Sequence, residues 1–448
     1  MKDSTDNLEK IRQQFDQAPY PRTALERSPD NDPYLLYTHS LITAYYLRHQ
    51  QVISSQDKLI LDVGCGTGYT TLVLAAANPG AKVVGIDISP VSIDLAHKRA
   101  AYHNYKNVEF HTLGVDELEQ LGLIFDYINC DEVLYLLADP QGSLVMMRSI
   151  LHPQGIIRTN LHSYYQRTEF YQAQELFKLM GLQANSPQQR EIEMVRETMA
   201  AMGDRVILKA QTWEQDYYQD NEGVLCNFLL VGDKGYTMAE TLTMLEMAEL
   251  ELFSMVDWRK WQVLDLFKEP DNLPIYLSFA LAAMPLTQQL EMYELLHPVH
   301  RLLDFWCGHA GETPEKIPVA EWETADWQQV TVHLHPQLLS DEVREEAIAQ
   351  IKSSKPFQIS WHLPLTGEPY LIDPKITSCI LPLWDSSQKF TDLLTRWQSL
   401  YSLYPVTLAP AIVEEAQEIL INALTEWESL GYIMLVGGLT NSLQVQNI

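Results

Sequence analysis

A short apolar run that breaks into three closely spaced glycines constrains the fold of this chain more than any other feature. Residues 59–63 are apolar except for Asp62, and glycines then occupy every second position. The three are Gly64, Gly66 and Gly68. Because glycine adopts backbone conformations that a Cβ would block, the pattern predicts a strand, a tight turn and a helix over about 69–77. The amides at the start of such a helix suit an anion or a carboxylate.

Two acidic residues set this motif apart from a dinucleotide-binding fingerprint. The glycine spacing is G-x-G-x-G rather than G-x-G-x-x-G, and Asp62 stands two residues before the first glycine. A carboxylate there would repel a pyrophosphate but attract the cationic amino end of an amino-acid-like ligand. Asp87 ends the next apolar run, where it can accept hydrogen bonds from the two hydroxyls of a ribose.

Together these residues resemble the first motif of the class I S-adenosylmethionine-dependent methyltransferases, which reads D-x-G-x-G-x-G as residues 62–68 do. The resemblance implies S-adenosyl-L-methionine as the cofactor and S-adenosyl-L-homocysteine as the product. It places adenine at the turn after the third strand, where Val115 stands in the position of the usual acid and Asp116 follows. The loop that begins at Asp131 faces the sulfonium in that family, although Asp131 also fits a simple helix cap. The resulting cofactor-binding residues are Asp62, Gly64, Cys65, Gly66, Gly68, Asp87, Ile88, Val115, Asp116 and Asp131.

Strand and helix patterns alternate from residue 58 to residue 161, as a doubly wound parallel sheet requires. The predicted strands are 59–63, 82–87, 107–112, 124–130 and 155–161, and the predicted helices are 69–77, 90–103 and 140–151. Ligands of such sheets bind beyond the carboxyl ends of the strands. The predicted fold class is therefore α/β, a Rossmann-like doubly wound sheet followed by mostly helical and small α+β accessory domains.

After residue 161, apolar residues at helical spacing predominate, with short strand-like pieces between them. The predicted helices are 164–181, 188–203, 237–253 and 286–304, and the strand-like pieces are 205–211 and 224–231. Thr237 and Glu240 form a capping box at the start of the third helix. A proline-rich stretch at 314–318 marks a boundary, and helices are expected again at about 386–400 and 409–430.

These patterns divide the chain into four segments. They are an N-terminal helical lid at 1–50, a catalytic domain at 51–163, a helical accessory or regulatory region at 164–313 and a C-terminal α+β domain at 314–448 that resembles a winged helix. Stretches 16–21, 235–267 and 297–306 resemble cyanobacterial-type methyltransferases with a methyltransferase regulatory domain, an architecture similar to that of rickettsial protein-lysine methyltransferases. In the lid, four aromatic residues either close the site or only cover the sheet. They are Phe15, Tyr20, Tyr34 and Tyr37.

The charge and cysteine content narrow the classes of partner and compartment. A formal net charge of −28 argues against sequence-independent binding of nucleic acid and against adhesion to an anionic membrane. The five cysteines are scattered without a C-x-x-C pair, and the first fifteen residues contain no apolar core. No apolar run approaches the ~18 residues needed to cross a bilayer. We therefore expect a cytoplasmic protein.

A group of histidines near residue 300 is the one pattern that raises the question of a metal. His297, His300, Cys307 and His309 lie close together in the sequence. Their spacing matches no zinc pattern, and isolated imidazoles more often satisfy local hydrogen bonds, so we expect no metal.

The predicted activity is transfer of a methyl group to a nitrogen or oxygen atom of an acceptor. A protein or peptide amine fits the acidic chain and its large accessory region, whereas a small metabolite hydroxyl or carboxylate fits almost as well. A non-catalytic regulatory protein that binds S-adenosylmethionine is a third alternative. A general base is needed only if the acceptor arrives protonated, and the candidates are Glu132, Tyr20 and His39. The helical region after residue 161 is a candidate surface for a homodimer.

Overall fold

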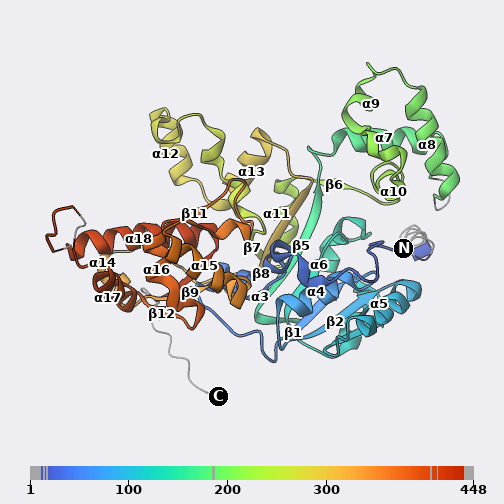
Figure 1. The fold of residues 1–448 in the computed structure, drawn as a ribbon. Coiled ribbons are helices and arrows are strands. Elements are labelled where there is room, and N and C mark those ends of the chain that lie inside the picture. Colours follow the sequence, from blue (N-terminus) through green and yellow to red (C-terminus); the bar gives the residue numbers. More distant parts are fainter. Residues whose placement is uncertain are drawn as a thin grey trace. The chain divides into compact units, whose positions relative to one another are not determined.

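The computed structural model describes residues 12–13, 16, 19–183, 187–403, 406–410 and 412–437 (Figure 1). These residues form two compact units, each built from more than one stretch of the chain. The described parts of 1–29, 56–75 and 79–312 make up the first unit, and those of 30–55, 76–78 and 313–448 make up the second.

One mixed sheet forms the centre of the first unit. Its strands follow the order β3-β2-β1-β4-β5-β8-β7, and β6 pairs with the end of β5. The strands are β1 (Leu59–Val63), β2 (Lys82–Asp87), β3 (Val108–Thr112), β4 (Phe125–Cys130), β5 (Leu151–Ser163), β6 (Gly235–Tyr236), β7 (Leu250–Met255) and β8 (Leu302–His309). β1 to β5 run parallel, whereas β8 is antiparallel to both of its neighbours. The predicted α/β fold class is confirmed.

The first five strands and the helices between them lie where the sequence predicts. The helices are α4 (Tyr69–Ala77), α5 (Pro90–Tyr102) and α6 (Pro140–Ser149). Side-chain caps begin two of them, since Ser89 accepts a hydrogen bond at the start of α5 and Asp139 accepts one at the start of α6. The strand order reverses between β1 and β4, so their carboxyl ends border the crevice in which an open α/β sheet binds its ligand.

Two further strands extend this sheet beyond the domain boundary predicted at residue 163. The predicted helix 237–253 divides into α11 (Met238–Met247) and β7, and the predicted helix 286–304 divides into α13 (Leu286–Leu296) and the start of β8. Glu249 adopts a left-handed conformation (φ 54°) just after α11, and Pro298 follows α13. Apolar residues at helical spacing lie on both sides of each break, so the spacing alone does not reveal it. The sheet of the catalytic domain therefore continues to residue 309.

A helical insert, residues 164–234, separates β5 from β6 and is drawn in green in Figure 1. It contains α7 (Thr168–Leu179), α8 (Gln189–Ala201), α9 (Ile207–Thr212) and α10 (Asn221–Phe228). The strand-like pieces predicted at 205–211 and 224–231 are wrong, because α9 and α10 occupy most of them. Phe228 of α10 instead packs against Phe177 of α7 in a small apolar core. The insert thus has a core of its own.

The remaining helices of the first unit follow β6. α11 begins with the predicted capping box, in which the Glu240 amide donates to the Thr237 hydroxyl and the Thr237 amide donates to the Glu240 carboxylate. α12 (Ile275–Ala283) then precedes α13. Among the helices that the structure describes, none combines the length and the apolar character needed to span a membrane.

The second unit combines helices with two small antiparallel sheets. Its strands are β9 (Thr331–Leu334), β10 (Phe357–Gln358), β11 (Leu371–Ile372), β12 (Gln388–Lys389) and β13 (Ile433–Val436), ordered β12-β9-β13 and β10-β11. Its helices are α2 (Pro33–Thr38), α3 (Leu41–His49), α14 (Thr324–Trp327), α15 (Asp341–Ser353), α16 (Pro374–Ile380), α17 (Phe390–Leu400) and α18 (Val413–Leu430). The Tyr46 hydroxyl of α3 donates to Glu428 of α18 (2.7 Å). The predicted lid at 1–50 is therefore divided, because its residues from 30 onward belong to this unit.

Candidate active site

The glycine turn after β1 adopts the conformations that its sequence predicts. Gly64, Gly66 and Gly68 have positive φ angles of 71°, 51° and 81°. A Cβ on Gly66 would overlap the carbonyl oxygen of Tyr20, and a Cβ on Gly64 would overlap the side chain of Val133. Glycine therefore allows both the segment before β1 and the loop after β4 to approach the turn closely.

Asp87, at the end of β2, directs its carboxylate at this turn. One oxygen accepts a hydrogen bond from the Gly66 amide (3.0 Å) and the other accepts one from the Ser89 amide (2.8 Å). Burial raises the pKa of Asp87, and the two amide hydrogen bonds oppose that shift. A carboxylate can accept about four hydrogen bonds, so Asp87 retains the capacity to accept two more. Its position fits the ribose hydroxyls of S-adenosylmethionine.

The carboxylate of Asp62 is already engaged within the protein. Its side chain is buried, one oxygen accepts from the Thr71 hydroxyl (2.7 Å), and the other accepts from the Asn129 amide (2.9 Å). Burial raises the pKa of Asp62 to about 7, while the two hydrogen bonds oppose the increase. Asp62 therefore ties β1 to α4 and β4, and any attraction to a cationic amino group comes in addition to this structural role.

Residues 19–25, called the N-terminal strap below, lie against the glycine turn. The Thr67 amide donates to the Tyr20 carbonyl (3.0 Å), and the Thr67 hydroxyl donates to the Pro21 carbonyl (2.8 Å). Arg99 of α5 donates to two further strap carbonyls, at 2.7 and 2.9 Å. These four donors hold the strap at one position over the turn.

Four other residues predicted to bind the cofactor lie at or beside the same strand ends. Ile88 follows β2 and is half-buried, and Cys65 is buried in the turn, which raises the pKa of its thiol. Val115 begins a short 3-10 helix (Val115–Leu121) and is half-buried, whereas the neighbouring Asp116 is exposed. Because Asp116 is exposed, its carboxylate is accessible to a ligand.

Asp131, directly after β4, belongs to a cluster of charged groups. It accepts a hydrogen bond from the Asn160 amide and lies 3.8 Å from the guanidinium of Arg158. Arg158 also pairs with Asp304 of β8 at 2.8 Å. Burial raises the pKa of Asp304 to about 6, and the charge of Arg158 opposes that shift. The cluster fixes the loop after β4 to β5 and β8.

A pocket of about 390 Å³ opens beside the carboxyl ends of β4 and β5. Its walls come from the strap, the loop after β4, the end of β5, the helical insert and the residue just before β8. The lining residues are Tyr20, Glu132, Tyr135, Leu136, His162, Arg167, Asp220, Glu222, Gly223, Cys226, Asn227, Leu230 and Arg301. Tyr20 contacts the glycine turn through its carbonyl and also lines this pocket. The turn and the pocket are therefore adjacent.

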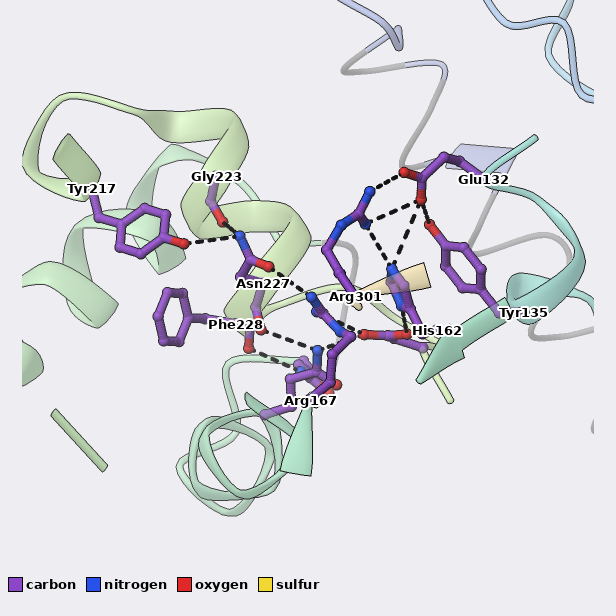
Figure 2. A network of polar contacts seen from close by, with 12 residues as sticks. Glu132, Tyr135, His162, Arg167, Tyr217, Gly223, Asn227, Phe228 and Arg301 are labelled. Atoms are coloured by element: carbon purple, nitrogen blue, oxygen red, sulfur yellow. Dashed lines mark hydrogen bonds and ion pairs between the residues drawn. The ribbon is translucent and has the colours of Figure 1, made fainter. Parts of the chain in front are cut away.

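Glu132 occupies a strained position at the mouth of this pocket. Its φ angle is 59°, a left-handed conformation that costs a non-glycine residue roughly 1–3 kcal/mol and often marks a functional site. Its amide donates to the Asn160 side chain (2.9 Å), and its carboxylate pairs with Arg301. The Tyr135 hydroxyl donates to the same carboxylate (2.7 Å). These contacts hold the glutamate side chain at the edge of the pocket (Figure 2).

His162, the last residue but one of β5, contacts a partner through each ring nitrogen (Figure 2). Nδ1 lies 2.7 Å from Asp233, and Nε2 lies 2.9 Å from Arg301. Because a guanidinium only donates, Nε2 is the acceptor and Nδ1 carries the proton. The ring stacks on Tyr135 with 3.8 Å between centroids. Burial lowers the pKa of His162, although the Asp233 carboxylate acts to raise it, so the imidazole is neutral near pH 7.

Asp233 anchors this arrangement from inside the protein. Its side chain is completely buried and also accepts hydrogen bonds from Arg167 (3.3 Å) and Gln174 (2.9 Å). Burial favours the neutral form of Asp233, but the hydrogen bond from His162 and the charges nearby outweigh it and lower the pKa. Asp233 is therefore an ionised acceptor for His162.

The sequence analysis did not single out His162, Asp233 or Arg301. His162 directly follows the predicted strand 155–161, so the rule that ligands bind beyond strand ends could have found it. Asp233 and Arg301 lie 71 and 139 residues away along the chain. No local pattern connects them to a strand end, and only the tertiary fold brings them to the pocket.

Of the three candidate bases, Glu132 and Tyr20 line the pocket, whereas His39 belongs to the second unit. His39 Nδ1 lies 2.8 Å from the Leu35 carbonyl of α2. Tyr34 and Tyr37 of the predicted lid also belong to that unit, and Phe15 falls outside the described residues. Of the described aromatic residues that were predicted to form the lid, Tyr20 is therefore the one that lies beside the glycine turn.

The histidines near residue 300 make local contacts. His300 stacks on Trp261 with 4.5 Å between ring centroids, and His309 Nε2 lies 3.2 Å from the Leu151 carbonyl. Within the described ranges, no group of three or more His, Cys, Asp or Glu side chains has an arrangement that could hold a metal ion.

Comparisons with known proteins match part of this chain to a family model and to several relatives. Residues 54–223 match the family model of a methyltransferase domain. An uncharacterized protein of Synechococcus is 27% identical over 271 residues, which are 60% of this chain and 63% of that protein. The ubiquinone biosynthesis O-methyltransferase of Acinetobacter baumannii is 33% identical over 100 residues, which are 22% of this chain and 41% of that enzyme. The chain thus spans less than two thirds of the length of these relatives.

A solved structure shares the fold over nearly the whole chain. PKMT2 from Rickettsia typhi is 16% identical, with a TM-score of 0.59, over 96% of this chain and 79% of that one. The same protein in complex with AdoHcy gives a TM-score of 0.57. At this identity the likeness concerns the fold. Residues 54–223 therefore match a methyltransferase domain by sequence, within a fold that PKMT2 shares over nearly the whole chain.

Proposed function

We propose that this chain transfers a methyl group from S-adenosylmethionine to a nitrogen or oxygen atom of an acceptor that enters the pocket beside Glu132. The observation that carries the proposal is the double position of Tyr20. Its carbonyl accepts from Thr67 in the glycine turn (3.0 Å), and the same residue lines the pocket. A donor held at the turn would therefore have its reactive end beside the acceptor.

Each part of the donor has residues of suitable chemistry. Asp87 would hold the ribose, the glycine turn and Asp62 the methionine end, and Val115 and Asp116 the adenine. Asp131 and Glu132 would face the sulfonium. When bound, the donor supplies its sulfonium methyl group, and its sulfur keeps the electrons of the broken bond. The chain's contribution is to hold donor and acceptor in line and to exclude water.

The charges of the pocket favour a cationic acceptor, which agrees with a protein or peptide amine. Glu132, Asp220 and Glu222 line it, and the whole chain carries a net charge of −28. Arg167 and Arg301 offset part of this charge, but each already pairs with a carboxylate. An amine on a flexible side chain would meet an excess of carboxylates at the mouth of the pocket.

A small metabolite is the second candidate, because the pocket volume of about 390 Å³ falls in the range that small-molecule sites occupy. Among the relatives, the Acinetobacter baumannii protein bears the name of an O-methyltransferase. A hydroxyl or carboxylate acceptor would suit such a site. The third alternative is a regulatory protein that binds S-adenosylmethionine but does not transfer its methyl group.

Two measurements separate these possibilities. Calorimetry with S-adenosylmethionine and S-adenosylhomocysteine tests the donor site, with Asp87→Asn as the variant expected to bind weakly. Incubation of the protein with methyl-labelled donor and a lysate of the source organism, followed by fractionation by size, then identifies the class of acceptor. Label in large species supports a protein acceptor, label in small species supports a metabolite, and binding without label supports the regulatory alternative. Absence of both binding and label would refute the proposed function.

Two further predictions from the sequence remain to be measured. Sedimentation velocity would decide between a monomer and the proposed homodimer. Fractionation of cells of the source organism would locate the protein, for which we propose the cytoplasm.

A further inference from the structure

The imidazole of His162 is held at both nitrogens (Figure 2). Its two partners differ in accessibility. Asp233, at Nδ1, has no exposed side-chain area, whereas the side chain of Arg301, at Nε2, is 46% exposed. His162 itself is 2% exposed and lines the pocket. The basic nitrogen is thus the one on the pocket side, and the group now bonded to it is the more exposed of the two partners.

We propose that His162 is the general base of the methyl transfer and that Asp233 positions it. This inference rests on the proposed function. In the step, the O–H or N–H bond of the acceptor breaks and the proton forms a bond to His162 Nε2. The electron pair left on the acceptor atom forms the bond to the methyl group, whose bond to sulfur breaks with its electrons staying on sulfur. Arg301 vacates Nε2 as the acceptor enters and remains paired with Glu132. The imidazolium gives its proton to water after the product leaves.

The hydrogen-bond pattern is the one that a histidine base requires. Asp233 accepts from Nδ1 and so fixes the tautomer in which Nε2 holds a free electron pair. It would also stabilise the positive charge that the ring gains, as the carboxylate does in other carboxylate–histidine pairs. Arg167 and Gln174 hold Asp233 in place from the insert. Tyr135 stacks on the His162 ring and limits its rotation.

The neighbouring groups are less suited to this role. The Glu132 carboxylate is paired with Arg301 and accepts from Tyr135. Burial raises the pKa of Tyr20, and the charge of Glu132 raises it further, so the phenol keeps its proton. The charged groups that face His162 are Asp233, Arg301, Glu132 at 3.8 Å, and Arg167 farther along the same network.

A general base has a consequence for the acceptor. A carboxylate has no proton to lose near pH 7, so it needs no base, whereas a hydroxyl or a protonated amine does. The pocket geometry therefore favours an acceptor atom that carries a proton on arrival. Of the acceptors considered above, the amine and the hydroxyl remain and the carboxylate does not.

The test compares His162→Gln and Asp233→Asn with His152→Gln, a control on the same strand whose side chain is exposed. For each protein, calorimetry gives the affinity for S-adenosylmethionine, and incorporation of labelled methyl groups into lysate is followed as a function of pH. Nitrogen NMR of the His162 ring in the wild type and in Asp233→Asn gives its tautomer and pKa without any turnover.

We expect His162→Gln to lose about 100- to 10,000-fold in methyl transfer while it binds the donor as the control does. Because the Asp233 carboxylate raises the pKa of His162, Asp233→Asn should shift the acidic limb of the pH profile to lower pH and lower its plateau. The ring should carry its proton on Nδ1 in the wild type.

Transfer by His162→Gln within threefold of the control, a wild-type ring protonated on Nε2, or a pH limb that Asp233→Asn does not move would each overturn the proposal. If His162→Gln does not fold, the tautomer seen by NMR and the pH profile of Asp233→Asn decide whether His162 is the general base. A wild type that neither binds the donor nor labels the lysate would instead refute the proposed function, and the inference would fall with it. If the wild type binds the donor and labels the lysate, the proposed function stands, and a failure of the variants then counts against the role of His162 alone.

Discussion

Asp62→Asn should remove a loss of stability that we expect when the pH rises from about 4 to about 7. Burial raises the pKa of Asp62 from 3.8 to about 7, against the hydrogen bonds from Thr71 and Asn129. A carboxyl with a raised pKa binds its proton more tightly in the folded state than in the unfolded state. It therefore stabilises the fold fully below its unfolded pKa, and this contribution is lost as the pH rises through the folded pKa.

The magnitude follows from the two pKa values. Each tenfold difference in proton affinity corresponds to about 1.4 kcal/mol, so the contribution of Asp62 should decrease by about 4 kcal/mol between about pH 4 and pH 8. Asparagine has nothing to ionise and suits the same contacts, because its carbonyl can accept from Asn129 and its amide can donate to the Thr71 hydroxyl. The substitution should thus leave the fold intact.

Urea unfolding of the wild type and Asp62→Asn at a series of pH values tests this reasoning. The difference between their free energies of unfolding isolates Asp62 from all other titrating groups, which the two proteins share. It should grow in favour of the variant with increasing pH. Asp94→Asn, at an exposed site on α5, is the control and should show a flat difference. A flat difference for Asp62→Asn as well would refute the argument.

Three further predictions concern the donor site. Asp87→Asn should weaken binding of S-adenosylmethionine by about 10- to 100-fold in calorimetry, since a hydrogen bond to a charged group contributes about 1.5–3 kcal/mol; Asp94→Asn should bind as the wild type does. Gly66→Ala should lose donor binding, because its Cβ meets the strap backbone and its φ angle costs alanine about 1–2 kcal/mol; unchanged affinity and melting temperature would contradict this. Arg99→Met should remove two of the strap's side-chain anchors, so hydrogen exchange should rise in residues 19–25 and remain unchanged in β1.

The sheet was predictable where the spacing of apolar residues changed at the boundary between a strand and a helix. The first five strands and their three helices follow the alternation of short apolar runs and helical spacing, and the ends agree closely. The pattern failed where a helix was followed by a strand within a few residues. α11 and β7, like α13 and β8, are separated by at most five residues, and apolar residues at helical spacing lie on both sides of each break.

The donor half of the site was predictable because it comes from one local motif and one strand end. The glycine turn and Asp87 are close in sequence, and the contact from the Gly66 amide to Asp87 spans 21 residues. In the acceptor half, the sequence analysis named Glu132 and Tyr20, which line the pocket, but not the residues around His162. Its central contacts join His162 to Asp233 and Arg301, and nothing in the sequence near Arg301 indicates that a residue just before an antiparallel strand will reach the end of β5.

The two halves of the site depend on different parts of the first unit, and this division has a mechanistic consequence. Asp87 and His162 lie at the ends of β2 and β5, so the central sheet fixes both the proposed donor contact and the proposed base. More than half of the residues that line the pocket come from the insert, which packs around its own apolar core. Substitutions in the insert can therefore reshape the pocket without disturbing the glycine turn. The link between the halves is Asp233, which lies near the end of the insert and orients His162. On this view, the insert sets both which acceptor enters and whether the base that receives its proton is correctly oriented.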